Sequence, residues 1–120
     1  MPKLLLVEDD ELTADVVTLA LQYEGFTVHT ATNGNSALKL AQTESYDLIL
    51  SDIMMPEMDG MQFISALRQT PGPNQQTRAL AISAMGRKQG ALAAGFDGFI
   101  AKPFDLTQLL DSIRSTSQTA

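Results

Sequence analysis

The sequence predicts an α/β domain built on a five-stranded parallel sheet with helices on both faces. Short apolar, β-branched segments alternate along the chain with segments whose apolar residues recur at helical spacing. Parallel neighbours need crossover connections, and because these crossovers are right-handed the helices must be shared between the two faces. The chain has 120 residues and is 44% hydrophobic, which suits one domain with a packed core. We therefore expect residues 1–120 to form a single unit.

The expected elements are bounded by turn residues and by abrupt changes to polar sequence. We place the strands at residues 3–7, 27–31, 47–51, 79–83 and 99–101. We place the helices at residues 11–24 and 36–43, in the segment that follows Gly60 and stops at Pro71, at residues 91–94, and after Asp105. The regular alternation of the two kinds of element is what favours a parallel sheet.

Three of the helices carry apolar residues at helical spacing. These residues are Leu12, Val16, Leu19, Ala20 and Tyr23 in the first helix, Met61, Ile64 and Leu67 in the third, and Leu106, Leu109, Leu110 and Ile113 in the last. Asp105 is expected to cap the last helix, with Gln108 reaching back to complete a capping box. Residues 115–120 are polar, and we expect them to fray.

Composition excludes several classes of function. The chain contains no cysteine, which removes disulfides, thiolate metal ligands and a cysteine nucleophile. Its formal net charge of -6 is unfavourable for direct binding to nucleic acid. The amino terminus does not have the pattern of a signal peptide, and no apolar stretch is long enough to span a bilayer. We therefore expect a cytoplasmic protein that binds neither nucleic acid nor membrane.

The residues that end the expected strands share a chemical character. They are Glu8, Asp9 and Asp10 after the first strand, Asp52 after the third, Ser83 at the end of the fourth and Lys102 after the fifth. Ligands of open parallel sheets bind beyond the carboxyl ends of the strands. The sequence therefore predicts a site in which several carboxylates, a hydroxyl and an ammonium lie together.

Such a site favours a hard cation and an anionic group. Carboxylates at close range repel one another unless a cation lies among them, and oxygen ligands of this kind suit Mg²⁺. Mg²⁺ and Lys102 together would balance the negative charge of three carboxylates. An incoming phosphoryl group would then meet both cations, and the carboxylate of Asp52 could accept it as an aspartyl phosphate. Ser83 could donate a hydrogen bond to another phosphoryl oxygen.

Four motifs at these positions resemble the receiver domain of two-component response regulators. They are Leu4-Leu5-Leu6-Val7-Glu8-Asp9-Asp10, the segment from Asp47 to Gly60 that contains Asp52, Ser83-Ala84, and Lys102-Pro103-Phe104. The resemblance covers essentially the whole chain. It implies a flavodoxin-like, chemotaxis-Y-like fold with the strand order 2-1-3-4-5.

The resemblance also implies which residues accept the phosphoryl group and hold the metal. Asp52 matches the phosphoacceptor, which also contacts the metal. Asp9 matches the acid that binds Mg²⁺ directly, and Glu8 matches its neighbour, which acts on the metal through water. Met54 matches the position whose backbone carbonyl is a further ligand of the metal.

Four more matches concern the phosphoryl group and the conformational switch. Lys102 matches the lysine that contacts the phosphoryl group, and Pro103 matches a cis proline that follows this lysine. Ser83 matches the switch hydroxyl. Phe99 matches the switch aromatic, although an aromatic residue on a strand is more often simply part of the core.

Two features depart from the usual pattern of the family. Glu8 stands where aspartate is commoner. The stretch between Ser83 and Lys102 is about three residues shorter than usual, close to one turn of helix, and the missing residues fall around 86–90. We therefore expect a shortened fourth helix and an altered output surface.

We interpret the chain as a receiver that accepts a phosphoryl group on Asp52 in a Mg²⁺-dependent reaction. The donor would be a histidine kinase or a histidine phosphotransfer protein. The output would be a downstream protein target, or an output or kinase domain fused to the receiver. Such a domain is a signalling domain rather than an enzyme, although it promotes its own phosphoryl transfer and dephosphorylation.

Alternative interpretations remain for the chain and for single residues. The shortened fourth helix would also suit an interaction module that works without phosphorylation. A Mg²⁺-dependent phosphatase with Asp52 as nucleophile would lack a general acid two residues further on, where Met54 stands. Asp10 could be the N-cap of the first helix. His29, the one histidine of the chain, is expected to be an ordinary residue on the surface of a strand.

Overall fold

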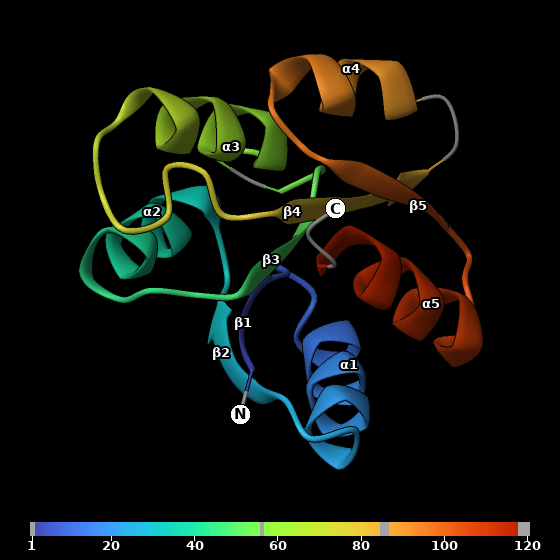
Figure 1. The fold of residues 1–120 in the computed structure, drawn as a ribbon. Helices are drawn as coiled ribbons and strands as arrows, with labels where there is room; N and C mark the ends of the chain where they lie inside the picture. Colours follow the sequence, from blue (N-terminus) through green and yellow to red (C-terminus); the bar gives the residue numbers. More distant parts are fainter. Residues whose placement is uncertain (1, 56, 85–86, 118–120) are drawn as a thin grey trace.

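The computed structural model describes residues 2–55, 57–84 and 87–117 (Figure 1). Its strands are β1 (Lys3–Val7), β2 (Thr27–Ala31), β3 (Leu48–Asp52), β4 (Ala79–Ala84) and β5 (Gly98–Lys102). Its helices are α1 (Glu11–Tyr23), α2 (Gly34–Thr43), α3 (Gly60–Gln69), α4 (Lys88–Ala94) and α5 (Leu106–Ser117). None of the helices in these ranges is long and apolar enough to cross a membrane.

The strands form one parallel sheet in the order β2-β1-β3-β4-β5. This arrangement confirms the strand order implied by the family resemblance. Every residue of β3 is buried, because the strand lies in the middle of the sheet and helices cover both of its faces. Since all the strands run in the same direction, their carboxyl ends meet at one edge of the sheet.

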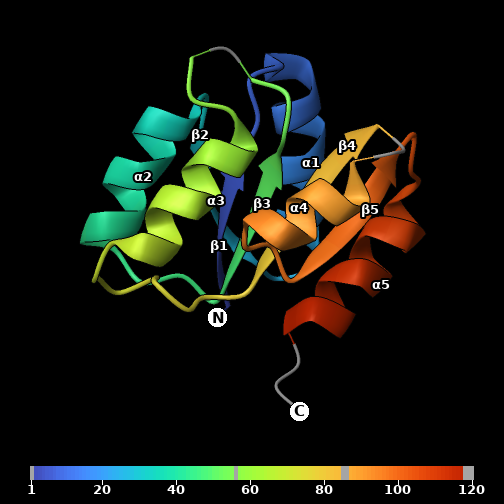
Figure 2. The ribbon, with the colours of Figure 1, turned by 90° about the horizontal axis from the view of Figure 1, so that it is seen from above.

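The helices lie on both faces of the sheet, as expected. Figures 1 and 2 show α2, α3 and α4 on one face and α1 and α5 on the other. Alternate side chains of β1 enter the two halves of the core: Leu5 and Val7 pack under α2, α3 and α4, whereas Leu4 and Leu6 pack under α1 and α5. Phe63 of α3 is a large residue of the first half that helical spacing had not identified.

Helix α1 buries a different face from the one that carries most of its large apolar residues. Val17 and Leu21, one turn apart, face the sheet and are buried. Four other apolar residues are between 60% and 89% exposed: Leu12, Val16, Leu19 and Tyr23. Apolar residues occur on two sides of this helix, so their spacing predicts a helix correctly but does not determine which side meets the sheet.

Helix α5 follows the expected pattern in part. Leu109 and Ile113 are buried, but Leu106 is 47% exposed, so the buried face is narrower than predicted. The capping box is confirmed: the Gln108 backbone N–H donates to Oδ1 of Asp105 at 2.8 Å, and the Asp105 N–H donates to Oε1 of Gln108 at 2.9 Å. The helix continues through Ser117, into the segment expected to fray, and residues 118–120 lie outside the described residues.

Helix α4 has seven residues and is the shortest of the described helices. It begins three residues before the predicted start at residue 91 and ends at the expected C-cap, Gly95. Residue 86, where the shortening was expected to begin, lies outside the described residues. The helix therefore forms as a short element with little core of its own, since Ala91 is its buried residue.

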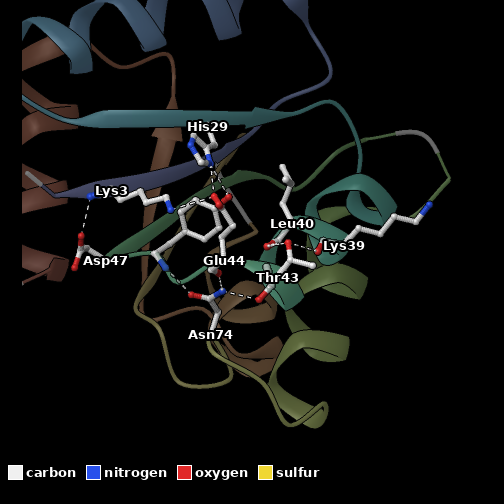
Figure 3. Close-up of polar contacts among 10 residues, drawn as sticks. Lys3, His29, Lys39, Leu40, Thr43, Glu44, Asp47 and Asn74 are labelled. Atoms are coloured by element: carbon white, nitrogen blue, oxygen red, sulfur yellow. Dashed lines mark hydrogen bonds and ion pairs between the residues drawn. The ribbon is translucent and has the colours of Figure 1, made fainter.

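A polar network fixes the amino-terminal edge of the sheet, opposite the strand ends that carry the acidic residues (Figure 3). His29 of β2 is half-buried, and its Nδ1 lies 2.9 Å from the Tyr46 hydroxyl and 3.1 Å from Oε2 of Glu44. Lys3 of β1 pairs with the same Glu44 oxygen at 3.0 Å. The buried Asn74 accepts a hydrogen bond from the Tyr46 backbone at 2.9 Å. His29 thus lies on a strand with its side chain 36% exposed, as expected, and it also takes part in this structural network.

Candidate functional site

The carboxyl ends of β1 and β3 bring three acidic side chains together. Glu8 and Asp9 follow β1, and Asp52 is the last residue of β3. One carboxylate oxygen from each of these three residues lies within 4.8 Å of the others. Glu8 and Asp52 are buried, whereas Asp9 is exposed. The sheet thus gathers acids that are more than forty positions apart in the chain.

Lys102 supplies positive charge to this cluster from the end of β5. Its ammonium lies 3.0 Å from Oδ2 of Asp52 and 3.8 Å from Oε2 of Glu8. The peptide bond between Lys102 and Pro103 is cis, in agreement with the family resemblance. The two distances place the ammonium among the carboxylates, within reach of an anionic group bound beside Asp52.

Burial and mutual charge shift the pKa values of two groups in the cluster. Burial raises the pKa of Glu8, the negative charge of Asp52 raises it further, and it reaches about 7 from an ordinary value of 4.5. Burial disfavours the charged form of Lys102, but its hydrogen bond to Asp52 and the charges of Asp52, Glu8 and Asp9 outweigh this effect and raise its pKa. One ammonium is thus too little positive charge for three carboxylates. A set of carboxylate oxygens that lacks counter-charge fits a hard divalent cation.

Asp10 does not belong to this cluster. It is the N-cap of α1, as one of the two interpretations of the sequence proposed, and it accepts hydrogen bonds from the Thr13 backbone N–H at 3.0 Å and from the Thr13 hydroxyl. These bonds lower the pKa of Asp10. The carboxylate of Asp10 therefore caps α1, the helix that follows the candidate metal ligands Glu8 and Asp9.

The loop between β3 and α3 folds back tightly onto the end of β3. The Gly60 N–H donates to the carbonyl oxygen of Ile53 at 2.8 Å, and a Cβ at Gly60 would lie 2.2 Å from the backbone oxygen of Asp52. Only glycine fits such an approach. Sequence reasoning treated Gly60 as turn punctuation and missed this role. The available signal was the capping box formed by Asp59 and Gln62 immediately around it.

The same loop is attached to α2. The Gly34 N–H donates to the carbonyl oxygen of Met58 at 3.1 Å, and a Cβ at Gly34 would lie 2.5 Å from that oxygen. Met54 lies in this loop, two positions after Asp52, with its side chain 57% exposed. Two glycines from different helices therefore hold the segment that carries the predicted carbonyl ligand.

Ser83 and Phe99 lie on the two strands beyond β3. Ile82 of β4 is opposite Asp52, so the buried Ser83 is one residue further along the neighbouring strand. Phe99 of β5 is opposite Ala81, is half-buried and packs against the core under α2, α3 and α4. The strand register thus places residue 83 nearer to the level of Asp52 than residue 99.

Fold and site together define a class of protein: a flavodoxin-like domain with an acidic, lysine-bearing site at the carboxyl edge of its sheet. The family model of the response regulator receiver domain matches residues 4–114, and the chain belongs to this family. It is a phosphoacceptor signalling domain of the two-component type.

Relatives of the chain include whole response regulators and isolated receiver domains. The response regulator ArlR of Staphylococcus saprophyticus is 36% identical over 96% of this chain and 52% of its own length. The chain thus spans about half the length of the curated relatives it matches.

Two solved structures illustrate the similarity of fold. The chemotaxis response regulator CheY4 of Vibrio cholerae is 34% identical, with a TM-score of 0.90, over 97% of this chain and 98% of that one. The receiver domain of the sensor histidine kinase PA1611 of Pseudomonas aeruginosa is 26% identical, with a TM-score of 0.90, over 98% of both chains. That structure has a magnesium ion coordinated in its active site cleft.

Proposed function

We propose that Asp52 accepts the phosphoryl group in this receiver. The observation that carries the proposal is the contact of 3.0 Å between Oδ2 of Asp52 and the ammonium of Lys102, in a cluster that also holds Glu8 and Asp9. A buried carboxylate oxygen that lies beside a positive partner is held in one place and can act as a nucleophile. Glu8 is less suited to this role, because its raised pKa keeps part of it protonated at neutral pH.

In the proposed reaction an oxygen of Asp52 forms a bond to phosphorus while the bond from phosphorus to a donor histidine nitrogen breaks. The electron pair of that bond leaves with the imidazole, and the product is an aspartyl phosphate. During the transfer the ammonium of Lys102 would exchange its contact with the Asp52 carboxylate for a contact with a phosphoryl oxygen, where negative charge collects. Ser83, near the carboxyl end of β4, would donate its hydroxyl hydrogen to a second phosphoryl oxygen.

The acidic cluster is proposed to hold Mg²⁺. Asp9 and Asp52 would bind it directly, the carbonyl oxygen of Met54 would be a third ligand, and Glu8 would act through water. The ion would offset the negative charge that collects around the phosphoryl group during transfer. Support comes from the donor set itself and from the metal-bound Pseudomonas relative.

The proposed phosphodonor is a protein, either a histidine kinase or a histidine phosphotransfer protein. The exposed apolar side of α1, formed by Leu12, Val16, Leu19 and Tyr23, supports this proposal. It begins two residues after the N-cap Asp10, at the end of α1 that directly follows Glu8 and Asp9 in the chain. A small phosphodonor would not need such a surface, whereas a protein that brings a phosphohistidine to Asp52 would cover it.

The output is proposed to pass through Ser83 and Phe99. Attraction of the Ser83 hydroxyl to the phosphoryl group would change the space beside β4 and let the ring of Phe99 move inward. The affected surface would be formed by α4, β5 and α5. A downstream protein, or an output or kinase domain of a longer chain, would bind it.

The decisive experiment treats the protein with Mg²⁺ and phosphoramidate and follows intact mass and amide chemical shifts. The wild type should gain one phosphoryl group and show shifts near residues 8, 52, 83 and 102, whereas Asp52→Asn should do neither. Equal behaviour of the two proteins would favour a phosphorylation-independent interaction module. Steady turnover of many phosphate esters would favour a phosphatase.

A further inference from the structure

Away from the acidic site, one arginine joins segments that lie far apart in the sequence. Arg68, in the last turn of α3, donates from Nε to the carbonyl oxygen of Gly95 at 3.1 Å. Its Nη1 donates to the carbonyl oxygen of Gln75 at 3.0 Å, and its Nη2 donates to Oδ2 of Asp97 at 3.1 Å. We call Arg68, Gln75, Gly95 and Asp97 the Arg68 network. It uses every nitrogen of the guanidinium, a geometry that lysine could not reproduce.

Asp97 extends this network into the sheet. Its Oδ2 also accepts a hydrogen bond from the Ala79 backbone N–H at 2.9 Å, and its own N–H donates to the Ala79 carbonyl oxygen at 2.8 Å. Ala79 is the first residue of β4. The side chains of Arg68 and Asp97 are 20% and 34% exposed, so their ion pair is partly shielded from water. The turn between α4 and β5 is thus attached to both α3 and β4.

The same turn packs closely against Arg68. Gly95 is the C-cap of α4 and has a φ of 130°, a conformation that L side chains rarely adopt. A Cβ at Gly95 would lie 2.9 Å from Cγ of Arg68. The next residue, Phe96, is buried in the core. The C-terminal end of α4 is therefore held by hydrogen bonds, by an ion pair and by close packing.

Among the described residues 87–94, no side-chain hydrogen bond or ion pair holds the N-terminal end of α4. Its N-cap, Arg87, makes no side-chain capping hydrogen bond, and Ala91 is the buried residue of the helix. Gly90 approaches Met61 of α3 so closely that a Cβ would lie 3.0 Å from Cε of Met61. Because glycine and alanine bury little apolar surface, packing contributes little to holding this end of the helix.

We propose that the Arg68 network anchors the C-terminal end of α4, so that the helix moves about the turn at residues 95–97 while β5 keeps its register. The mobile end is the one that follows β4 and its Ser83. A displacement of Ser83 toward a phosphorylated Asp52 would shift the start of α4 and leave the turn in place. This second step rests on the proposed function, whereas the anchoring itself does not. Arg68 is thus a positioning residue in the output half of the domain.

Residue-resolved amide hydrogen exchange without ligand tests the anchoring. Arg68→Gln should raise exchange at residues 95–97 by about tenfold or more relative to amides of β3, because charged hydrogen bonds are lost locally. Asp97→Asn keeps an oxygen that can accept from Ala79, so it should raise exchange at the same residues by a smaller factor. This second variant decides the question if Arg68→Gln folds poorly. Arg78→Gln removes the same charge from an exposed residue before β4 and is the control.

Beryllofluoride with Mg²⁺ tests the movement. In the wild type we expect exchange to change in the first turn of α4 and to stay constant at residues 95–97; in Arg68→Gln the change should reach that turn. Equal exchange at residues 95–97 in Arg68→Gln and Arg78→Gln would overturn the anchoring. Parallel changes at both ends of α4 in the wild type would overturn the movement. If beryllofluoride causes no change that depends on Asp52, the proposed function fails, and the ligand-free comparison still decides the anchoring.

Discussion

The Lys102 ammonium lies 3.0 Å from Oδ2 of Asp52, although the two residues end strands that are not neighbours. β4 runs between β3 and β5, so the lysine side chain must reach across the end of β4. Two strand spacings amount to about 10 Å between backbones, a span that a short side chain could not cross. The length of lysine and the position of β5 are therefore both needed to bring positive charge to the phosphoacceptor candidate.

Replacing Lys102 should slow phosphorylation while the fold is retained. Lys102→Gln removes the charge that would stabilise the phosphoryl group in transit, and we expect the phosphorylation rate with phosphoramidate to fall by about 100-fold. Mass spectrometry over time measures this rate. Lys39→Gln, at an exposed lysine of α2, is the matched control. Similar rates in the two variants would show that Lys102 has no part in the transfer.

Glu8 should make the stability of the metal-free protein depend on pH. Its pKa is about 7 in the folded protein and 4.5 ordinarily, so the folded state binds this proton more tightly than the unfolded chain. The stabilisation by the bound proton is complete below about pH 4.5 and is lost as the pH rises to about 7. The wild type should therefore lose stability relative to Glu8→Gln across this interval.

Chemical denaturation in the presence of a chelator, repeated across this pH range, measures the effect. The carboxyl carbon resonance of Glu8 should titrate near pH 7 in the same conditions. A constant difference between the two proteins across the interval would mean that Glu8 is ionised throughout. That result would contradict our inference that the cluster lacks positive charge.

A methyl group at Gly60 should damage the site through the backbone. Gly60→Ala would force the loop away from the Asp52 carbonyl, and we expect a loss of stability of about 1–3 kcal/mol together with weaker Mg²⁺ binding. Gly72→Ala is a stringent control, because a Cβ there would meet nothing within 4 Å. Thermal unfolding and Mg²⁺ titration provide the two measurements. Unchanged Mg²⁺ binding in Gly60→Ala would show that the loop does not position the metal ligands.

The exposed apolar side of α1 should affect the rate of phosphotransfer from a protein donor but not from a small-molecule donor. Val16→Gln should lower the rate of phosphotransfer from a phosphorylated histidine phosphotransfer protein by about tenfold, as expected for an apolar interface residue. The rate with phosphoramidate should not change. Leu92→Gln alters an exposed apolar residue on α4, on the other face of the sheet, and is the control. An equal loss with both donors would place the effect in the site rather than in docking.

The positions of the reactive side chains follow from the sequence because they depend on local pattern. Short apolar runs predict the strands, and in a parallel sheet the residue after each run must lie at the carboxyl edge. The pattern alone therefore assigns Glu8, Asp9, Asp52 and Lys102 to one edge of the sheet. The caps at Asp10 and Asp105 are equally local, since each bonds to a residue three positions further on.

Other features were settled only by contacts between distant segments. The rotation of α1 about its axis depends on which side packs better on the sheet, and both of its sides carry apolar residues. The need for glycine at position 60 arises from the oxygen of Asp52, which the returning loop meets in space. The Arg68 network joins residues from 68 to 97 whose spacing has no helical or strand period. Local sequence thus determined the helices and strands and the chemistry at their ends. The tertiary structure decided how helices are oriented and where backbones approach closely. These features depend on shape complementarity between surfaces that are distant in the sequence.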